Sequence, residues 1–387
     1  MENIKVSVIM PSLNVSKYIR PCIESVIHQT LRDIEIICVD AGSTDGTLEI
    51  LEEYAGSDPR ISVIRSEKKS YGYQMNLGMD AAKGKYMGIV ETDDYAELNM
   101  FEKLYEAAEA DSLDVVKSGY FLYYSDPEEV NEVVPITSHV FSKKIFCPLT
   151  DFASPREHAE FFNIKPTIWS AIYRLDFLRE SGIRFNETPG AAFQDTSFNF
   201  KVFALAGRVR LLEDCFLHYR QTSAGSSVSS PKTMYCVADE YHEIEAFLDS
   251  RPELKRLLSG VKCYLKYNTY VWNYNRLNET LRKEFIQFAS KELIKERALG
   301  NFQKQYYPWY KWKTMHWIAN KPLEYHAYRQ KEKEGEYGNA EAQPPFEESF
   351  ADKVRRNWRM LREYAEIYGW RITLQKALRK IGGKLGL

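Results

Sequence analysis

Three carboxylates within four residues are the feature of this sequence most able to do chemistry. Glu91, Asp93 and Asp94 directly follow the apolar run 86–90, with Thr92 between the first two. Mutual repulsion would raise the pKa of at least one carboxyl group unless a cation neutralised it. Mg²⁺ and Mn²⁺ prefer oxygen ligands and are often held by one or two carboxylates together with substrate phosphates. The group therefore predicts either a divalent-metal site or a solvated acidic turn.

A second polar turn begins at Asp40. It contains Gly42 and Gly46, which permit positive φ angles, and Ser43 and Asp45, which are candidate caps for a helix starting at residue 47. Asp40 lies at the end of an apolar run, where its carboxylate could accept hydrogen bonds from a nucleobase. By itself this segment is equally compatible with a purely structural turn.

The elements that must position these turns form a regular alternation. Apolar, β-branched runs predict strands at 6–10, 35–39, 61–64, 86–90 and 113–116, and helical spacing covers 18–27, 47–54, 73–82 and 100–110. Repeated strand–helix units imply a largely parallel sheet with helices on both faces. Ligands bind such sheets beyond the carboxyl ends of the strands. Because the turns at Asp40 and Glu91 both follow predicted strands, their position favours a ligand site over an arbitrary loop.

Five short segments match, in order, the motifs of one known family. They are the strand and P-x-x-N turn at 8–14, the helix end S-x-x-x-Q-T at 25–30, a V-D-D-G-S-T-D-G-T-like turn at 39–47, an N-x-G…A-x-G-x-Y pattern at 76–86, and the acidic turn at 91–94, where the family carries D-x-D-D. In these segments the sequence resembles the family 2 glycosyltransferases. The resemblance covers residues 4–125 well and 168–230 less tightly.

From about Met234 onward the pattern turns helical and rich in Tyr and Trp, which predicts a helical region at 231–387. For a catalytic domain at residues 1–230, the resemblance implies a GT-A fold, a Rossmann-like, mostly parallel α/β sheet. It also implies that Pro11, Leu13 and Asp40 hold the nucleobase, commonly uracil. The predicted donor-binding residues are Pro11, Leu13, Asp40, Asn76, Glu91, Thr92, Asp93 and Arg220, and the predicted ligands of Mn²⁺ or Mg²⁺ are Asp93, Asp94 and His218. Such a metal would stabilise the departing nucleoside diphosphate as a Lewis acid.

The expected catalytic base is Asp195, in a segment at 192–198 that resembles the family's E-D-x-x-F motif. An acceptor hydroxyl that attacks an anomeric carbon must lose its proton in the transition state. Direct displacement with one base inverts the anomeric centre. The alternative interpretation of Asp195 is a helix N-cap.

Two further positions resemble family segments. Trp169, in the segment 167–174, matches one that lines the acceptor side, although a Trp in an apolar run is also typical of a core. Arg220, preceded by His218 and Tyr219, matches a Tyr-Arg pair ahead of a Ser-rich loop. Its guanidinium could bind the diphosphate bidentately or form a structural salt bridge.

Four positions depart from the family pattern. Ala41 replaces the second Asp of the D-D-G-S turn, and Glu91 replaces the first Asp of the acidic motif with a side chain one methylene longer. Met75 lies where many members have Arg, which removes a predicted phosphate contact. Gln194 in place of Glu is a milder change.

Composition argues for a globular protein without a nucleic-acid partner. The 387 residues are 44% hydrophobic, and 52 basic against 54 acidic residues give a net charge of −2. The six cysteines show no CxxC pairing, which is typical of reduced thiols in the cytosol. The start of the sequence lacks the pattern of a secretory signal, and no run approaches the roughly 20 apolar residues that span a bilayer. We therefore expect a cytoplasmic protein, soluble or peripheral on the inner face of the membrane.

Two regions outside the strand–helix alternation also allow predictions. The proline-containing stretch 125–165 is irregular, which favours a mobile loop over the site. The aromatic and basic segment 306–313, Trp317 and the amphipathic segment 371–381, which has no acidic residue, favour binding to an anionic membrane surface. Packing against the catalytic domain or a partner is the competing interpretation.

Together these features predict a metal-dependent, inverting glycosyltransferase that moves a sugar from a nucleoside-diphosphate donor, expected to be UDP-linked, to a hydroxyl of a glycan or lipid-linked glycan. The alternatives are a non-catalytic sugar-binding scaffold on the same fold and a sugar-1-phosphate nucleotidyltransferase. The Gly-rich, basic N-terminal loop of the second alternative is absent from this sequence.

Overall fold

The computed structural model describes residues 4–126, 128–136, 141, 144–221, 233–334 and 358. Within them, ten strands form one sheet. Along the main path their order is β3 (Ile61–Arg65), β2 (Ile34–Asp40), β1 (Val6–Ser12), β4 (Tyr86–Ile89), β9 (Ala171–Arg174), β6 (Val115–Tyr124), β10 (Val209–Arg220) and β5 (Tyr95–Ala96). Two more strands are attached at its side, β7 (Val130–Val134) on β6 and β8 (Ile145–Phe146) on β10.

The sheet is mostly parallel, as the sequence predicts. Strand β1 pairs in parallel with β2 and β4, β2 with β3, and β10 with β6, and these pairings hold most of the paired residues. Strand β9 runs antiparallel between β4 and β6, and β5, β7 and β8 also pair antiparallel with their neighbours. Every residue of β1 is buried, as expected for a strand covered by helices on both faces. Ser12 pairs with Asp40, so the carboxyl ends of β1 and β2 lie side by side.

The helices between these strands include the four predicted segments, 18–27, 47–54, 73–82 and 100–110, and two more. They are α1 (Ser16–Ile27), α2 (Thr47–Ser57), α3 (Tyr71–Ala81), α4 (Met100–Asp111), α6 (Leu175–Glu180) and α7 (Gln194–Leu205). Helix α3 approaches β1 very closely at Gly78, where a Cβ atom would lie 2.5 Å from Cγ2 of Ile9. Glycine at this position therefore sets the distance between α3 and the strand that ends at the acidic site.

The prediction of a loop at 125–165 is wrong for the described part of that stretch, which contains β7, β8 and α5 (Pro155–Phe162). Pro155 begins α5, and the Ser154 hydroxyl accepts the backbone N–H of Glu157 as the N-cap. A cluster of aromatic side chains then buries the stretch; its rings belong to Phe141, Phe146, Phe152 and Phe161.

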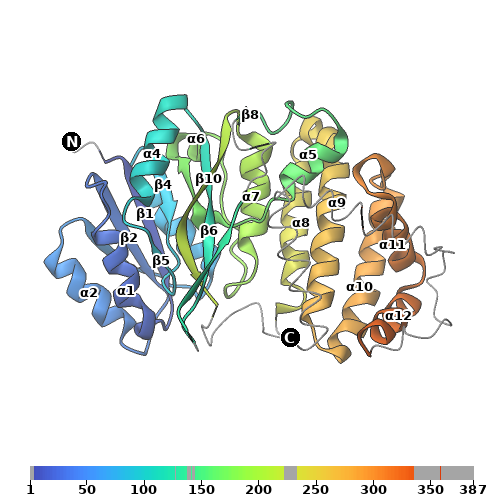
Figure 1. Cartoon of the computed structure of the whole chain (residues 1–387), viewed down its shortest axis with the longest axis horizontal. Coiled ribbons are helices and arrows are strands. Elements are labelled where there is room, and N and C mark those ends of the chain that lie inside the picture. Colours follow the sequence, from blue (N-terminus) through green and yellow to red (C-terminus); the bar gives the residue numbers. More distant parts are fainter. Residues whose placement is uncertain are drawn as a thin grey trace.

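Beyond the sheet the chain is helical, as predicted. Its helices are α8 (Cys236–Asp249), α9 (Pro252–Arg276), α10 (Glu279–Ala298), α11 (Trp309–Asn320) and α12 (Pro322–Glu334). Figure 1 shows them stacked beyond α7 at one end of the molecule. Helix α8 packs against α7, and α9 packs against α5. The helical region therefore packs against α5 and α7, two helices that precede β10 in the chain.

The aromatic segment around residue 310 packs inward. Tyr306, Tyr307 and Trp317 are all buried, and the Tyr307 ring contacts Tyr264 and Trp312. These three side chains therefore pack inside the molecule, and Tyr307 does so against α9 of the helical region. The segment 371–381 lies outside the described residues. Among the helices that the structure describes, none is both long and apolar enough to cross a membrane.

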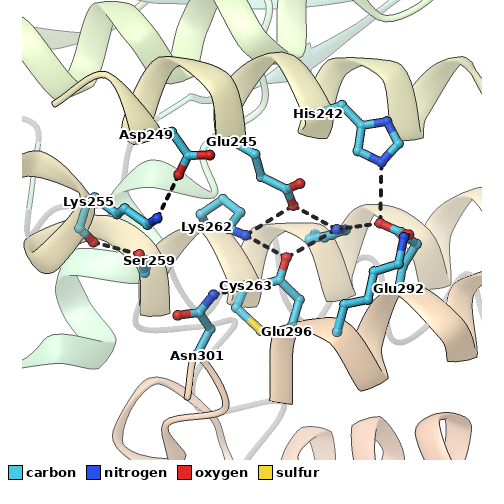
Figure 2. A network of polar contacts seen from close by, with 12 residues as sticks. His242, Glu245, Asp249, Lys255, Ser259, Lys262, Cys263, Glu292, Glu296 and Asn301 are labelled. Atoms are coloured by element: carbon cyan, nitrogen blue, oxygen red, sulfur yellow. Dashed lines mark hydrogen bonds and ion pairs between the residues drawn. The ribbon is translucent and has the colours of Figure 1, made fainter. Parts of the chain in front are cut away.

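A buried ionic network joins three of these helices (Figure 2). Lys262 and Lys266 of α9 lie between Glu245 of α8 and two acids of α10, Glu292 and Glu296. The Lys266 Nζ atom is 2.8 Å from Glu292 Oε2 and 2.9 Å from Glu245 Oε1. Because an unpaired charge in this interior would be costly, the network requires the three helices to keep their mutual positions.

Candidate functional site

The turn after β2 is built by the side chain of Asp40. Its Oδ1 atom accepts the backbone N–H groups of Gly42 and Ser43, both at 2.9 Å, and its Oδ2 atom accepts the Ser43 hydroxyl at 2.5 Å. Gly42 has a φ of +81°, the conformation that the sequence predicts for it. A carboxylate offers about four acceptor positions, so one on Oδ2 remains for a ligand.

The acidic turn after β4 is held from two sides. The Tyr71 hydroxyl of α3 donates to Glu91 Oε1 at 2.6 Å, and the backbone N–H of Arg220 donates to Asp94 Oδ1 at 2.8 Å. The other oxygen, Asp94 Oδ2, is buried without a hydrogen-bond partner in the described part of the chain. A buried carboxylate oxygen normally has a partner, so this atom marks a position where a cation would fit.

The carboxyl groups of this turn repel one another. Burial raises the pKa of Glu91 to about 8, and the negative charges of Asp93 and Asp195 add to that rise. Burial also raises the pKa of Asp94 well above its usual range, with the Asp93 charge as the next cause. Without a cation, the turn therefore binds protons more tightly than ordinary carboxylates do.

Asp195 lies in the first turn of α7, close enough to Glu91 for their charges to interact. The N-cap residue is Phe193, so the capping interpretation of Asp195 is wrong. Burial raises the pKa of Asp195 to about 6, although a backbone hydrogen bond from Thr196 and the charge of Lys117 partly oppose that rise. A carboxylate with such a pKa suits general-base work near neutral pH.

Lys117 of β6 is a buried cation beneath Asp195. Burial lowers the pKa of its ammonium group to about 7, and the Asp195 charge partly opposes that change. The Lys117 Nζ atom donates to the backbone oxygen of Thr167.

Gln194 explains how this region is joined to α3. Its Oε1 atom accepts the N–H of Ala192, and its Nε2 atom donates to Gly190 O and Thr188 Oγ1. Gly190 O in turn accepts the backbone N–H of Tyr71 at 2.9 Å. The Gln194 amide can donate these hydrogen bonds, whereas the carboxylate of the family's Glu cannot. Gln194 therefore fixes the loop before α7, which contacts Tyr71 through Gly190.

The predicted donor-binding residues on β1 lie next to the acidic turn. Pro11 is buried, and its carbonyl accepts the Thr92 hydroxyl at 2.8 Å, while Leu13 is 38% exposed at the end of the strand. Asn76 is engaged elsewhere: its amide makes hydrogen bonds with both the N–H and C=O of Phe185, and with Glu187. Asn76 therefore holds residues 185–187 against α3.

Arg220 lies over the acidic turn. Its Nε atom donates to Asp93 O at 2.9 Å, and its guanidinium carbon lies 5.0 Å from the Tyr18 ring centroid and 4.8 Å from that of Tyr123. Within the described ranges, neither terminal Nη atom of Arg220 has a hydrogen-bond partner, and no side-chain salt bridge forms. These two atoms are therefore placed to meet a phosphate.

The predicted metal-ligand set of three residues is not assembled. His218 is stacked between Tyr95 and Phe121, with Nε2 at 2.8 Å from Glu97 Oε1 and Nδ1 at 2.7 Å from Asn131 Oδ1. Both ring nitrogens thus have partners. No group of three or more His, Cys, Asp or Glu side chains suited to a metal occurs in the described residues. Asp93 and Asp94 remain as the candidate pair.

Trp169 packs as a core side chain. It is 8% exposed, meets Tyr120 edge-on at 4.9 Å and lies 5.2 Å from the Tyr219 ring. Burial raises the pKa of Tyr219, and the charges of Asp94 and Asp93 add to that rise, so Tyr219 lies near the acidic turn. Trp169 packs against Tyr219 and is thus separated from the turn by one ring.

Sequence reasoning missed Tyr71, Lys117 and Glu240. Tyr71 follows a predicted strand, and Lys117 is a lone cation in an apolar run, so both carried a recognisable pattern. Glu240, on α8, carried none. Its carboxylate accepts hydrogen bonds from Asn186 and from the Ser197 hydroxyl of α7, and burial raises its pKa to about 8.

Comparisons with known proteins identify the family and the fold. Residues 7–163 match the model described as "Glycosyl transferase family 2". The chain is 34% identical over 216 residues to the uncharacterized glycosyltransferase EpsJ of Bacillus subtilis, covering 56% of this chain and 61% of EpsJ, which is less than two thirds of that protein. It is 30% identical over 219 residues to glycosyltransferase GlyG of Streptococcus pneumoniae, covering 56% of this chain and 71% of GlyG. The crystal structure of S. aureus TarS 1–349 in complex with UDP shares the fold, with a TM-score of 0.62 at 18% identity over 88% of this chain and 94% of that one.

Proposed function

Because this chain belongs to the family 2 glycosyltransferases and has a GT-A fold, we propose that it transfers a sugar from a UDP-linked donor to a hydroxyl of a glycan or lipid-linked glycan, with inversion. The observation that carries the proposal is the proximity of Asp195 to Glu91 of the acidic turn, and the charges of both carboxylates also act on Tyr219. One carboxylate suited to take a proton thus lies beside a carboxylate turn suited to a metal–diphosphate group. The choice of UDP is supported by the TarS structures, which contain UDP or UDP-GlcNAc.

The donor nucleotide would lie along the carboxyl ends of β1 and β2. The remaining acceptor position on Asp40 Oδ2 suits a nucleobase N–H, and Pro11 and Leu13 would flank the base. The diphosphate would then reach the Nη atoms of Arg220, which the Tyr18 and Tyr123 rings hold in place. A guanidinium held in one orientation loses less entropy when it binds a phosphate.

Asp93 and Asp94 fit a divalent cation, Mn²⁺ or Mg²⁺. The unpartnered Asp94 Oδ2 atom and the raised pKa of the same carboxyl group both indicate missing positive charge. Two carboxylates suffice, because such ions commonly take their other ligands from phosphates and water. When bound, the metal would supply Lewis-acid stabilisation of the departing diphosphate.

Asp195 would accept the proton of the acceptor hydroxyl. The charge of Lys117 opposes protonation of Asp195, which keeps a larger fraction of this carboxyl group ionised near neutral pH. One base and one displacement give inversion of the anomeric centre. Glu91, held by Tyr71, would contact the ribose or a metal-bound water.

A turnover screen tests this proposal. Purified protein is mixed with Mn²⁺, a mixture of simple glycoside acceptors and one nucleotide-sugar at a time, and release of the nucleoside diphosphate is measured. We expect UDP release from at least one UDP-sugar, and its loss when EDTA is added. Binding without turnover for every nucleotide-sugar would contradict the proposal and favour a sugar-binding scaffold.

We also propose that the protein acts in polysaccharide synthesis at the cytoplasmic membrane surface. The support is the sequence at 371–381, which is basic, amphipathic and without acidic residues. A lipid-linked acceptor would make such attachment useful.

A further inference from the structure

An exposed tryptophan contacts the N-cap residue of α7, the helix that carries the proposed base. Trp272, on α9, is 44% exposed, although Trp side chains are usually well buried. Its ring meets Phe193 edge-on, with the ring centroids 5.6 Å apart and the planes at 84°. Phe193 directly precedes α7 and is two residues from Asp195.

The backbone of Phe193 is strained. Its φ of +71° lies in the left-handed region, which is rare for a bulky side chain without special context. Such conformations persist where the surroundings enforce them, and they cluster at functional sites. Here the surroundings include the carbonyl of Phe193, which accepts the N–H of Thr196, and the Gln194 amide, which fixes the preceding loop.

Arg276 completes the group from the same helix as Trp272. Its guanidinium carbon lies 5.1 Å from the Phe193 ring centroid and 5.6 Å from that of Trp272. Hydrogen bonds to Asn273 Oδ1 and Thr233 O hold the guanidinium in that position. The two rings and the cation are thus fixed relative to one another and to the start of α7.

We propose that the exposed Trp272 ring, supported edge-on by Phe193, forms a platform for a sugar ring of the acceptor saccharide. Aromatic faces are apolar and suit the C–H surface of a pyranose, while the polar edges of a sugar stay in water or meet a cation. The platform rests on the proposed function, since it places the acceptor beside Asp195. It also assigns the acceptor contact to an exposed ring of the helical region rather than to Trp169, which is 8% exposed.

The test compares Trp272→Ala with Trp272→Phe and with Leu257→Ala, a matched control on α9 where the side chain is 45% exposed. Acceptors are the p-nitrophenyl glycosides of glucose, galactose, N-acetylglucosamine and mannose. Their binding in the presence of UDP and diamagnetic Mg²⁺ is followed by saturation-transfer NMR, and their KM by UDP release from the UDP-sugar that the turnover screen identifies. We expect Trp272→Ala to raise the acceptor KM about tenfold or more, the loss of a modest contact.

Three further results are expected with it. UDP affinity and the thermal midpoint of Trp272→Ala stay at wild-type values, Trp272→Phe recovers at least part of the acceptor affinity, and Leu257→Ala behaves as wild type. An unchanged acceptor KM in Trp272→Ala would overturn the platform. So would a wild type that binds UDP but none of the four glycosides. Absence of UDP binding by the wild type would instead contradict the proposed function.

Discussion

Asp195 has a raised pKa and lies close to Glu91 of the acidic turn. Since its pKa is about 6 and a general base acts only when deprotonated, kcat/KM should rise as the pH increases through about 6 and then level off. Asp195→Asn should lower kcat by about 100-fold or more, with UDP affinity unchanged. Initial rates from pH 5 to pH 8 check both expectations. Normal turnover in the Asn variant would show that another group takes the proton.

Arg220 offers a test of diphosphate binding. Arg220→Gln removes the two unpartnered Nη donors, and charge-assisted hydrogen bonds contribute about 1.5–3 kcal/mol each, so UDP affinity should fall at least about tenfold. The control is Arg210→Gln on the same strand, because Arg210 pairs with Asp111 away from the site. Isothermal titration with UDP measures both. Equal affinities for the two variants would assign Arg220 a structural role.

At the residue scale, the sequence was informative where a motif alone defines the local geometry. Asp40 and the 91–94 turn follow strands, and the structure places Asp195 beside that turn. Asn76 and His218 could not be interpreted in this way. Their partners, Phe185 for Asn76 and Glu97 for His218, are 109 and 121 residues away in the chain. Because a short motif describes only neighbouring residues, it does not predict such pairs.

Among the elements, strands and helices of the sheet were predictable because apolar periodicity defines them. The antiparallel insertion of β9 between β4 and β6 was not, since strand order depends on pairing between distant segments. The stretch 125–165 was misjudged for a related reason. Its prolines predict breaks, yet Pro155 begins α5, and the burial of the surrounding Phe side chains depends on their mutual packing.

The buried network gives a prediction for the helical region. Lys266→Met keeps the side-chain volume but leaves Glu292 and Glu245 without their central cation, so the free energy of unfolding at pH 7 should fall by about 3–5 kcal/mol. Lys255→Met is the control, because Lys255 is an exposed residue of the same helix that pairs with Asp249. Urea denaturation measures both. A Lys266 variant within about 1 kcal/mol of wild type would show that the network contributes little.

The same network determines a pH dependence. Burial alone would raise the pKa of Glu292, but hydrogen bonds from Lys266 and Lys295 lower it to about 2, from an ordinary value of 4.5. A depressed native pKa stabilises the fold above pH 4.5, and that contribution is lost as the pH falls towards 2. The wild type should therefore lose stability over this range, and Lys266→Met should lose less.

For the whole molecule, the helical region meets the sheet's helices at α7, which carries the proposed base. Glu240 of α8 binds Ser197 of α7, one turn or less from Asp195, and α8 packs along α7. The division of the chain at residue 230 stays a prediction, because these contacts cross it. The helical character of the region after residue 230 was predictable from its sequence pattern, but its contacts with α7 were not.

The proposed membrane attachment through residues 371–381 also concerns the whole molecule. Deletion of residues 359–387 removes the basic segment 371–381, so binding to vesicles with anionic lipid should be lost while UDP affinity is unchanged. Co-sedimentation with anionic and neutral vesicles measures the difference. If the undeleted chain, residues 1–387, does not bind anionic vesicles, the proposed attachment is contradicted.

The most direct test of the central claim, a metal–diphosphate site at the acidic turn with a separate base, is titration of UDP by calorimetry. With Mn²⁺ present, the wild type and Asp195→Asn should bind one UDP with similar affinity, and Asp93→Asn or EDTA should abolish that binding. Metal-dependent UDP binding of wild-type strength by Asp93→Asn would contradict the account.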